Sequence, residues 1–344
     1  MKHDIENDKI ILGMKKYVPP FSITNEIVSL VSTIMEKIGR INSYENLSKY
    51  PILRKQNRIK SIHSSCAIEA NSLSIEQVSD VINGANVIGP QKDIIEIKNA
   101  IKAYDSIAAI NPFSVDDLKK THFLIGKDVV TLAGQYRSGN EGVSDENGNI
   151  IFVAPPPRMV SSHMDNLITW ANENFETINP LLLSSIFHYE FVFIHPFTDG
   201  NGRMARLWQN AILGKWKPIF YWLPLESYIK KYQDEYYSSI SKSHREGNAN
   251  AFVTFMLKMI DYTFDALISD AALVNKQYSI QVNKLLKAMR EDVWYTANEI
   301  LDLLKLKSKE TLRKNYLDPA INNKLIILEL PDKPTSRNQR YKII

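Results

Sequence analysis

One segment of this 344-residue chain is apolar around almost its whole circumference, and it restricts the fold more than any other feature. From Leu181 to Ile194 most residues are aliphatic or aromatic, so a helix here has little surface suited to water. Such a helix is stable only when neighbouring elements cover it on all sides. The sequence therefore predicts a central buried helix that forms the core of its domain.

Apolar residues recur at helical spacing along much of the rest of the chain, for example at Ile27, Leu30, Val31 and Ile34. No internal repeat or low-complexity segment interrupts the pattern. Because 44% of the residues are hydrophobic, the chain can bury a sizeable core. We therefore predict an all-α, mainly helical fold.

Composition excludes several classes of protein. The apolar runs are much shorter than the roughly 20 residues that a membrane helix needs, and residues 1–10 are too polar for a secretion signal. The single cysteine, Cys66, excludes an internal disulfide and a cysteine-rich zinc site. We expect a cytoplasmic protein without membrane contact.

A hairpin is the predicted exception to helix, between Gly134 and Pro157. Tyr136-Arg137 and Ile150–Val153 suit strands, and Asp145–Asn149 between them is rich in turn-forming residues. The three prolines 155–157 end the second strand because proline cannot donate to a ladder. A new helix is expected from near Met159.

The C-terminal part differs in composition, beginning near Asp270 to Ser279. From Gln281 to Ile344 there are 13 Lys and Arg against 8 Asp and Glu, a net +5, so the rest of the chain carries −1 of the total +4. Two helical segments, Trp294–Leu304 and Ser308–Tyr316, precede an end rich in Pro, Lys and Arg, which favours a winged helix-turn-helix. The basic excess suits an anionic partner, although solvated helix faces show the same excess.

The loop after the buried segment, His195 to Arg206, has the features of a phosphate site. Gly200, Asn201 and Gly202 can adopt positive φ and bring backbone N–H groups close to an anion. The helix that is expected from Arg203 onward directs the partial positive charge of its N-terminus to the same place. Together these features predict an anion cradle.

Side chains of this loop add charge and a base. Arg203 and Arg206 are three residues apart on one helix face, and two guanidinium forks suit a polyphosphate. Asp199 offers the hard carboxylate that Mg²⁺ prefers beside phosphate oxygens, and His195 can take a proton from an attacking hydroxyl. Each residue alone has an ordinary structural explanation, but all of them within twelve residues predict a site for a metal-nucleotide complex.

The stretch from His195 to Arg206 is similar, without a departure, to the signature of the Fic family, His-x-Phe-x-(Asp/Glu)-Gly-Asn-Gly-Arg-x-x-Arg. The resemblance implies an all-helical Fic core that binds ATP and Mg²⁺ and transfers AMP to a Ser, Thr or Tyr hydroxyl of a target protein. It also implies roles for the residues of the loop. These are His195 as the base, Asp199 as the Mg²⁺ ligand, Gly200, Asn201 and Gly202 as the anion hole, and Arg203 and Arg206 as the phosphate ligands.

Upstream, Ser65-Cys66-Ala67-Ile68-Glu69 resembles the inhibitory helix motif of the same family, in which Ser/Thr-x-x-x-Glu is followed by Gly or Asn. Ser65 and Glu69 lie one helical turn apart, so both can face the active site. The resemblance implies that Glu69 pairs with Arg206 and keeps the γ-phosphate from its productive position. Ala70 departs from the motif, and Asn71 follows one place later. In some members the same glutamate supports removal of AMP, so the reverse reaction stays open.

The resemblance also divides the chain into an N-terminal helical region over 1–110, with the inhibitory helix near 62–72, a Fic core over 111–275 and a winged-helix-like domain over 276–344. The hairpin 134–157 is then the flap, whose Ile151–Val153 pairs with the backbone of the target. Tyr236 and Tyr237 resemble an aromatic pair near the adenine, although core packing explains the pair equally well.

A second hypothesis starts from the basic C-terminal part. Ser308–Tyr316 as a recognition helix with Arg313 and Lys314, and a wing carrying Arg337, Arg340 and Lys342, suit contact with the DNA backbone. The protein would then be a nucleotide-responsive DNA-binding regulator. Protein contact through this domain, homodimer formation, and transfer of another phosphorylated group by a reversed nucleotide also stay open from the sequence.

Overall fold

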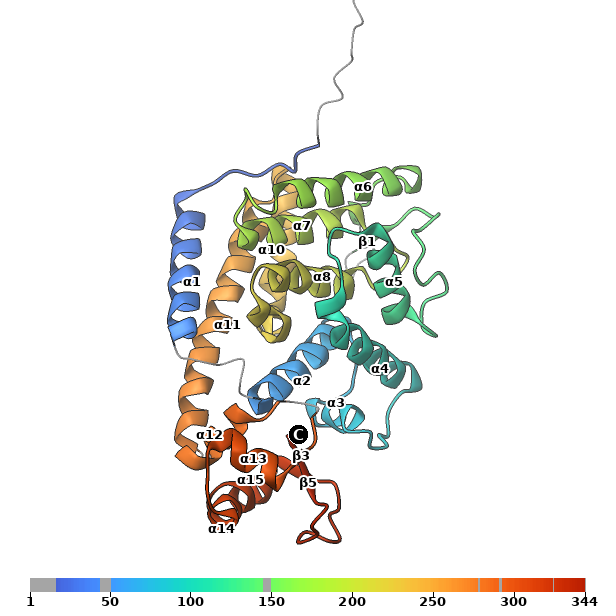
Figure 1. Ribbon diagram of the computed structural model, residues 1–344. Coiled ribbons are helices and arrows are strands. Elements are labelled where there is room, and N and C mark those ends of the chain that lie inside the picture. The colour runs from blue at the N-terminus through green and yellow to red at the C-terminus, as the bar shows by residue number, and fades with distance from the viewer. Residues whose placement is uncertain are drawn as a thin grey trace, which may run out of the picture.

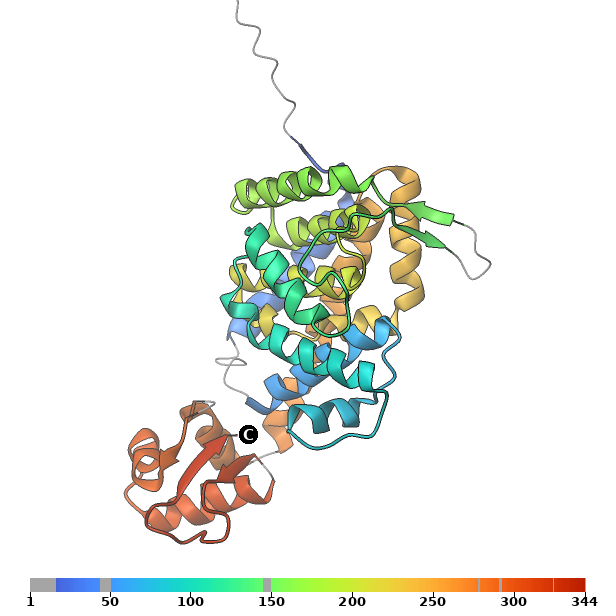
Figure 2. The same ribbon diagram turned by 90° about the vertical axis from the view of Figure 1, so that its right-hand side faces the viewer.

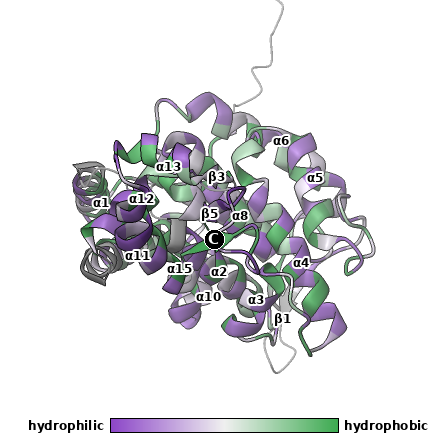
Figure 3. Ribbon diagram, turned by 60° about the horizontal axis from the view of Figure 1, so that its bottom comes forward, coloured by the Kyte–Doolittle hydropathy of each residue, from purple (hydrophilic) through white to green (hydrophobic). Residues whose placement is uncertain are grey.

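A computed structural model of the chain describes residues 17–43, 51–144, 150–277, 279–290, 293–323 and 325–343, and shows a mainly helical protein with two small antiparallel sheets in that part of the chain (Figure 1). The predicted fold class is confirmed. Hydrophobic and hydrophilic residues alternate along the outer helices (Figure 3), as expected for elements that bury one face. Among the described residues, no helix is both long and apolar enough to cross a membrane.

The larger body contains eleven α-helices within the described residues. They are α1 (Asn25–Ser43), α2 (Pro51–Ile68), α3 (Ile75–Ile82), α4 (Gln91–Asp105), α5 (Val115–Gly126), α6 (Pro157–Asn174), α7 (Pro180–Ile194), α8 (Asn201–Trp216), α9 (Leu225–Lys231), α10 (Gln233–Glu246) and α11 (Asn250–Gln277), with the 3-10 turns η2 (Ile107–Ala109) and η3 (Pro218–Trp222). In Figure 1, α1 lies beside the long α11, and α6 crosses the body next to α7.

Helix α7 is the buried central helix that the sequence predicts. Its first turn is set by Pro180 and by the side chain of Asn179, which accepts a hydrogen bond from the N–H of Leu181 at 2.9 Å. It packs against α6, α8 and α11, and the polar residues inside it have partners. For example, Nδ1 of His188 lies 2.6 Å from Oε1 of Gln209, and Glu190 accepts a 2.7 Å bond from Tyr17.

Helix α8 is also buried almost all round, although its sequence is far more polar than that of α7. Trp208 is fully buried and donates to the Pro112 carbonyl at 2.9 Å. Asn210 donates to the buried Glu226 at 2.7 Å. Because the Trp208 and Asn210 N–H groups donate hydrogen bonds, the helix can bring these polar side chains into the centre of the body.

The hairpin differs from its prediction in the first strand. Strand β2 (Ile150–Val153) is confirmed, but it pairs with β1 (Gly142–Ser144) and not with Tyr136-Arg137. The backbone at Arg137 is non-helical coil, because its N–H and its side chain bond to carbonyls outside any ladder, among them that of Pro196. The predicted turn Asp145–Asn149 lies outside the described residues. Figure 2 shows the hairpin projecting from the body.

The C-terminal lobe has the predicted winged helix-turn-helix arrangement, at the bottom of Figure 2. Its elements are α12 (Ile280–Ala288), β3 (Tyr295–Thr296), α13 (Ala297–Leu304), α14 (Lys309–Leu312), the π-helical turn η4 (Arg313–Leu317), α15 (Asp318–Asn322), β4 (Ile326–Leu328) and β5 (Arg340–Ile343). The sheet order is β3-β5-β4, so β4 and β5 form the wing beside the helices. The second helical segment is therefore longer than Ser308–Tyr316 and contains a π-helical turn.

Two separate hydrophobic cores occur in the described residues. One extends from Ile27 to Leu267 and the other from Val282 to Ile343. The first core contains residues from both the 1–110 and the 111–275 regions, so these parts pack as one body. The exact domain boundaries stay predictions.

The end of α2 places a non-glycine residue in the left-handed region. The N–H of Asn71 bonds to the Cys66 carbonyl and the N–H of Ala70 to that of Ala67, a Schellman pattern with Ala70 at C′ and φ of 65°. Glycine is favoured at this position because it has no Cβ to strain the turn. The family motif has Gly or Asn after its glutamate, and Ala70 occupies that strained position here.

We predict two unfolding transitions in calorimetry, because the two cores share no residue. Leu285→Ala in the second core should destabilise the C-terminal transition by roughly 2–5 kcal/mol and leave the other in place. Leu183→Ala should destabilise the transition of the larger body and leave the C-terminal transition in place, since Leu183 and Leu285 are each fully buried in their own core. A single transition that both variants lower equally would contradict the two-core description.

We also predict that Ala70→Gly stabilises the protein. Relief of a left-handed alanine is worth roughly 1–2 kcal/mol, partly offset by the extra unfolded-state entropy of glycine, so a net gain of about 0.5–1 kcal/mol is expected. The matched control is Ala67→Gly in the right-handed part of α2, which should lose about 1 kcal/mol. Chemical denaturation measures both, and two losses of similar size would argue against strain at Ala70.

Candidate active site

The loop between α7 and α8 is fixed by its own side chains. Helix α7 ends where His195 turns into the left-handed region, with φ of 50° and ψ of 60°. Asn201 then accepts a hydrogen bond from the Phe197 N–H at 2.9 Å and donates to the Phe197 carbonyl at 2.7 Å. Phe197 is fully buried, so the loop is anchored to the core at its centre.

His195 is held as a neutral base. Burial lowers the pKa of its imidazole below the ordinary value, and this effect outweighs the opposing hydrogen bond from the ring to the Val192 backbone carbonyl. A neutral imidazole can accept a proton, so the lowered pKa suits the predicted general base.

The N-terminus of α8 offers backbone donors to an anion. Its N-cap is Gly200, with φ of 80° and no side-chain cap. The first bond of the helix runs from the Met204 N–H to the Gly200 carbonyl, so the N–H groups of residues 201–203 have no partner within the helix. The macrodipole adds partial positive charge at this point. The N–H of Gly200 itself donates to Asp199 Oδ1 at 2.5 Å.

Arg206 lies fully buried beside this helix end and joins it to α2. Its Nη2 donates to Glu69 Oε1 at 2.9 Å and to the Ser65 carbonyl at 2.8 Å, and its Nε donates to Ser65 Oγ at 3.2 Å. Burial alone would lower the pKa of the guanidinium, but Glu69 raises it above the ordinary value, so Arg206 stays charged. Thus the structure brings both predicted inhibitory residues against the predicted phosphate ligand.

Arg203 pairs with two other carboxylates. Its Nη1 lies 3.2 Å from Glu96 Oε1, and its Nη2 lies 3.5 Å from Asp199 Oδ1. Three guanidinium nitrogens of these two arginines, Arg203 Nε, Arg203 Nη1 and Arg206 Nη1, are buried and make no hydrogen bond within the part of the chain that the structure describes. Buried donors of this kind are costly unless an anion satisfies them. The arginines therefore fit a phosphate-bearing ligand.

Asp199 fits a magnesium ion that is shared with phosphate. Its side chain is half-exposed, and no group of three or more His, Cys, Asp or Glu side chains among the described residues could hold a metal alone. Magnesium commonly uses one or two carboxylates together with phosphate oxygens and water. Asp199 beside an anion cradle is that kind of donor set.

Glu69 occupies part of the cradle in this structure. A Cβ atom built on Gly202 would overlap Glu69 Oε1, so the carboxylate lies directly over the first turn of α8. Only a glycine at this position lets the carboxylate approach so closely. The negative charge of Glu69 therefore stands where backbone donors and Arg206 would otherwise meet an anion.

The two tyrosines have different environments. Tyr236 is buried, its hydroxyl lies 3.0 Å from Nε2 of His188, and its ring packs against Phe252 and Phe255. It supports the core and has no free ring face. Tyr237 is 45% exposed, so of the predicted pair only this ring offers a surface on which a base could stack.

Several residues near the site carry no local sequence signal. Asn71 donates to Glu96 at 2.9 Å and to the Asp93 carbonyl at 3.1 Å, so it links the turn after Glu69 to the partner of Arg203. Tyr104 donates to Glu226 at 2.6 Å, and burial raises the pKa of Glu226. Only the three-dimensional arrangement identifies this second layer.

The C-terminal carbonyls of α2 are bound from the α9–α10 junction. Lys230 donates to the Ala67 carbonyl at 3.1 Å, and Gln233 donates to the Ile68 carbonyl at 3.3 Å. A cation at a helix C-terminus is favourable because unpaired carbonyls carry partial negative charge. These contacts hold Glu69 at the end of a capped helix.

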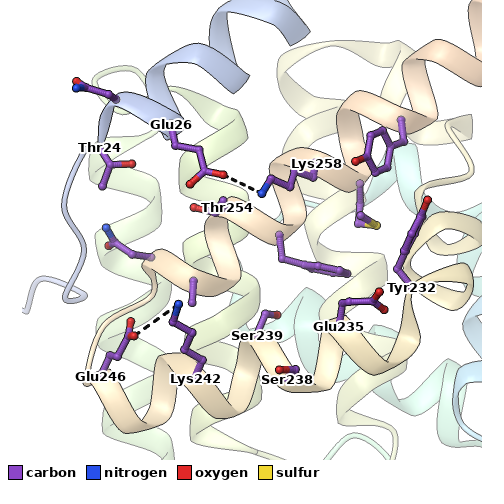
Figure 4. A pocket seen from close by; sticks show the side chains of 16 residues that line it. Thr24, Glu26, Tyr232, Glu235, Ser238, Ser239, Lys242, Glu246, Thr254 and Lys258 are labelled. Carbon is purple, nitrogen blue, oxygen red and sulfur yellow. Dashed lines mark ion pairs between the residues drawn. The ribbon is translucent and has the colours of Figure 1, made fainter.

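A groove of about 840 Å³ lies elsewhere, among α1, α10 and α11. In Figure 4 its polar side chains include two ion pairs, Glu26 with Lys258 at 2.8 Å and Lys242 with Glu246 at 3.8 Å. Its lining contains none of the predicted site residues. The chemistry-bearing residues therefore gather at the α7–α8 loop and not in this groove.

Comparisons with known proteins point to one family. Residues 112–213 match the model of the Fic/DOC family, and residues 280–344 match that of the "Filamentation induced by cAMP protein Fic-like, C-terminal domain". A curated protein adenylyltransferase Fic from Nematostella vectensis is 27% identical over 64% of this chain and 51% of its own length. Protein adenylyltransferase fic-1 from Caenorhabditis elegans is 29% identical over 67% of this chain and 46% of its own length. The chain thus spans about half the length of these relatives.

A solved structure matches nearly the whole chain. The crystal structure of a Fic family protein from Desulfovibrio desulfuricans G20 is 38% identical, with a TM-score of 0.70, and the match covers 95% of this chain and 98% of that one. The Caenorhabditis elegans Fic-1 structure, at 23% identity and a TM-score of 0.59, shares the fold over 72% of each chain. On the sequence identity and full-length coverage of the Desulfovibrio protein, this chain belongs to the Fic family.

Proposed function

We propose that this protein transfers AMP from ATP to a Ser, Thr or Tyr hydroxyl of a target protein, and that Glu69 restrains the reaction. The observation that carries the proposal is the buried Arg206, whose Nη1 lacks a partner among the described residues, beside the uncapped N-terminus of α8. A neutral imidazole lies at the other end of the same loop. The names of the curated relatives support this activity.

The chain's own groups divide the chemical work. His195 accepts the proton of the acceptor hydroxyl, because burial lowers the pKa of its imidazole and favours the neutral form. The N–H groups of residues 201–203 stabilise negative charge that develops on the α-phosphate. Arg206 and Arg203 bind the phosphates of the leaving pyrophosphate. Magnesium at Asp199 would neutralise phosphate charge.

Restraint follows from competition for Arg206. Glu69 takes one guanidinium nitrogen and covers Gly202, so a γ-phosphate cannot reach the same donors while Glu69 remains. Nucleotide in the productive position must therefore displace a carboxylate that is held at a helix end capped by Lys230. This competition makes the resting protein a weak enzyme.

The hairpin is the proposed dock for the target. Strands β1 and β2 form a two-stranded sheet, so each has a free edge on which a target strand could add. Val153 at the end of β2 is 64% exposed, which suits a contact with a partner. Phe152 anchors the hairpin to the body, because its ring stacks on that of His244 with the two ring centroids 4.2 Å apart.

Other reactions at the same site can be distinguished by their products. Removal of AMP, or transfer of another phosphorylated group, would use the same residues and leave a different mass on the target.

DNA binding by the C-terminal lobe is supported less by the structure than by the net charge of its sequence. Arg313 pairs with Asp318 at 3.6 Å, and Arg340 pairs with Glu329, so these basic residues are partly neutralised.

We predict that His195→Ala loses transfer of label from α-³²P-ATP to protein. Loss of a general base typically costs about 10² to 10⁴-fold in rate. Binding of ATP should change little, because the proposed phosphate donors are Arg203, Arg206 and the N–H groups of residues 201–203, and not the imidazole. Label transfer near the parent rate by this variant would remove His195 from the mechanism.

We predict that Glu69→Gly raises transfer of α-label, including self-modification, by about 10-fold or more, a typical size for coupling between competing groups. The reason is that Arg206 then becomes free for phosphate. The matched control is Glu36→Gly, an exposed glutamate on α1. Equal activity of the Glu69→Gly variant and the parent would reject inhibition by Glu69 but leave the transfer chemistry standing.

A further inference from the structure

We infer that Arg137 is a positioning residue, whose guanidinium holds the backbone of the general base His195 and both arms of the hairpin in one arrangement. The inference rests on the proposed function, since it assigns His195 and the hairpin their roles in transfer. Arg137 is buried, with only 2% of its surface exposed. It lies in the coil before β1, where the sequence predicted a strand.

Within the described residues, the hydrogen bonds of the guanidinium all go to backbone carbonyls. Nε donates to the His195 carbonyl at 2.7 Å, and Nη2 also approaches that of Ile194 at 3.3 Å. Nη1 donates to the carbonyl of Gly139, which precedes β1, at 2.8 Å. Nη2 donates to the carbonyl of Pro155, which follows β2, at 2.5 Å. One rigid, planar guanidinium group therefore connects the end of α7 with the backbone just before β1 and just after β2.

The end of α7 needs such a group. His195 is a non-glycine residue in the left-handed region, a conformation that costs roughly 1–3 kcal/mol and persists only when its surroundings impose it. The last carbonyls of α7 have no helical partner and carry partial negative charge. A buried cation that donates to two of them satisfies both requirements, and the Arg137 N–H adds a 2.9 Å bond to the Pro196 carbonyl.

A second connection fixes the far end of the loop to the same segment. The Gly134 N–H donates to Nδ1 of His122 at 2.8 Å, so the ring proton is on Nε2, which lies 2.9 Å from the Asp199 carbonyl. The His122 ring stacks on Phe197 with centroids 3.6 Å apart. Residues 134–139 are thus tied to the loop at Asp199 through His122 and at His195 through Arg137.

This arrangement links the proposed general base, His195, to the hairpin that is proposed to bind the target protein. The same side chain determines where His195 lies and where the hairpin leaves the body. None of its hydrogen bonds reaches Arg203, Arg206 or the first turn of α8. Loss of Arg137 should therefore affect alignment of base and acceptor, and not the binding of nucleotide.

The experiment compares Arg137→Ala and Arg137→Lys in the full-length Glu69→Gly protein. We expect kcat for transfer of α-label to fall about 10 to 100-fold in Arg137→Ala, because small misplacement of a reacting group costs this much. The Kd for ATP should stay within about 3-fold. Lysine should restore only part of kcat, since an ammonium cannot span four carbonyls. Methylguanidinium in solution should partly rescue Arg137→Ala.

The matched control is Asn250→Ala. Asn250 also ties two segments together, through three hydrogen bonds of 2.9 Å with Ser22, but it lies at the start of α11, outside the loop and hairpin. This variant should keep the kcat of its parent. Equal kcat in Arg137→Ala and parent, or parallel loss of kcat and ATP affinity without methylguanidinium rescue, would overturn the positioning role.

A readout independent of transfer separates this inference from the proposed function. In histidine-labelled protein, Arg137→Ala should move the imidazole NMR signal of His195, which His195→Ala identifies, and leave that of His163 on α6 in place. An unchanged His195 signal would overturn the inference even where transfer is observed. A parent without any transfer would defeat the proposed function, while the NMR result still decides whether Arg137 positions His195.

Discussion

A positive charge sits in the interior of the helical body, on Arg206, and the neighbouring structure is arranged to hold it. The side chain is almost completely buried, and taking an unpaired guanidinium out of water is expensive. The Ser65 carbonyl, Ser65 Oγ and Glu69 compensate it in this structure. Since Ser65 lies in the last turn of α2 and Glu69 directly follows that helix, the buried charge of Arg206 ties the end of α2 to α8.

The rest of the site follows from this buried charge. Glu69 can reach Arg206 only because residue 202 is glycine and because the end of α2 is held by Lys230 and Gln233. A phosphate group could compensate Arg206 as Glu69 does, so under the proposed function one set of donors would serve both restraint and catalysis. Around this centre, hydrogen bonds of Arg137 and His122 tie the α7–α8 loop to the segment before the hairpin.

Local patterns in the sequence predicted the parts of the structure that depend on neighbours along the chain. The all-apolar run predicted α7, the residues Ile150–Val153 after a turn-forming segment predicted β2, and the loop motif predicted a cradle at the start of α8. Tyr136-Arg137 was wrongly predicted as a strand. The residues look suited to a sheet, but Arg137 bonds to the carbonyls of His195 and Pro196, the first of them 58 positions away in the chain.

Contacts between distant segments explain the other differences. Asn71 with Glu96, and His122 with Asp199, join residues 25 and 77 positions apart, and no spacing rule connects them. Tyr236 and Tyr237 are adjacent in the sequence, yet one is buried and the other half-exposed, because the helix α10 turns them to different sides. Resemblance to a family found the loop, whereas only the packed structure shows what supports it.

Calorimetric titration with ATP and with AMP, in the presence of magnesium, tests most directly whether Glu69 and the terminal phosphates compete for Arg206. In the Glu69→Gly protein the affinity for ATP should rise by about 10-fold or more over the parent, while the affinity for AMP should change by less than about 2-fold, because only the former carries β- and γ-phosphates. An equal gain for both nucleotides, or no gain for ATP, would contradict the account.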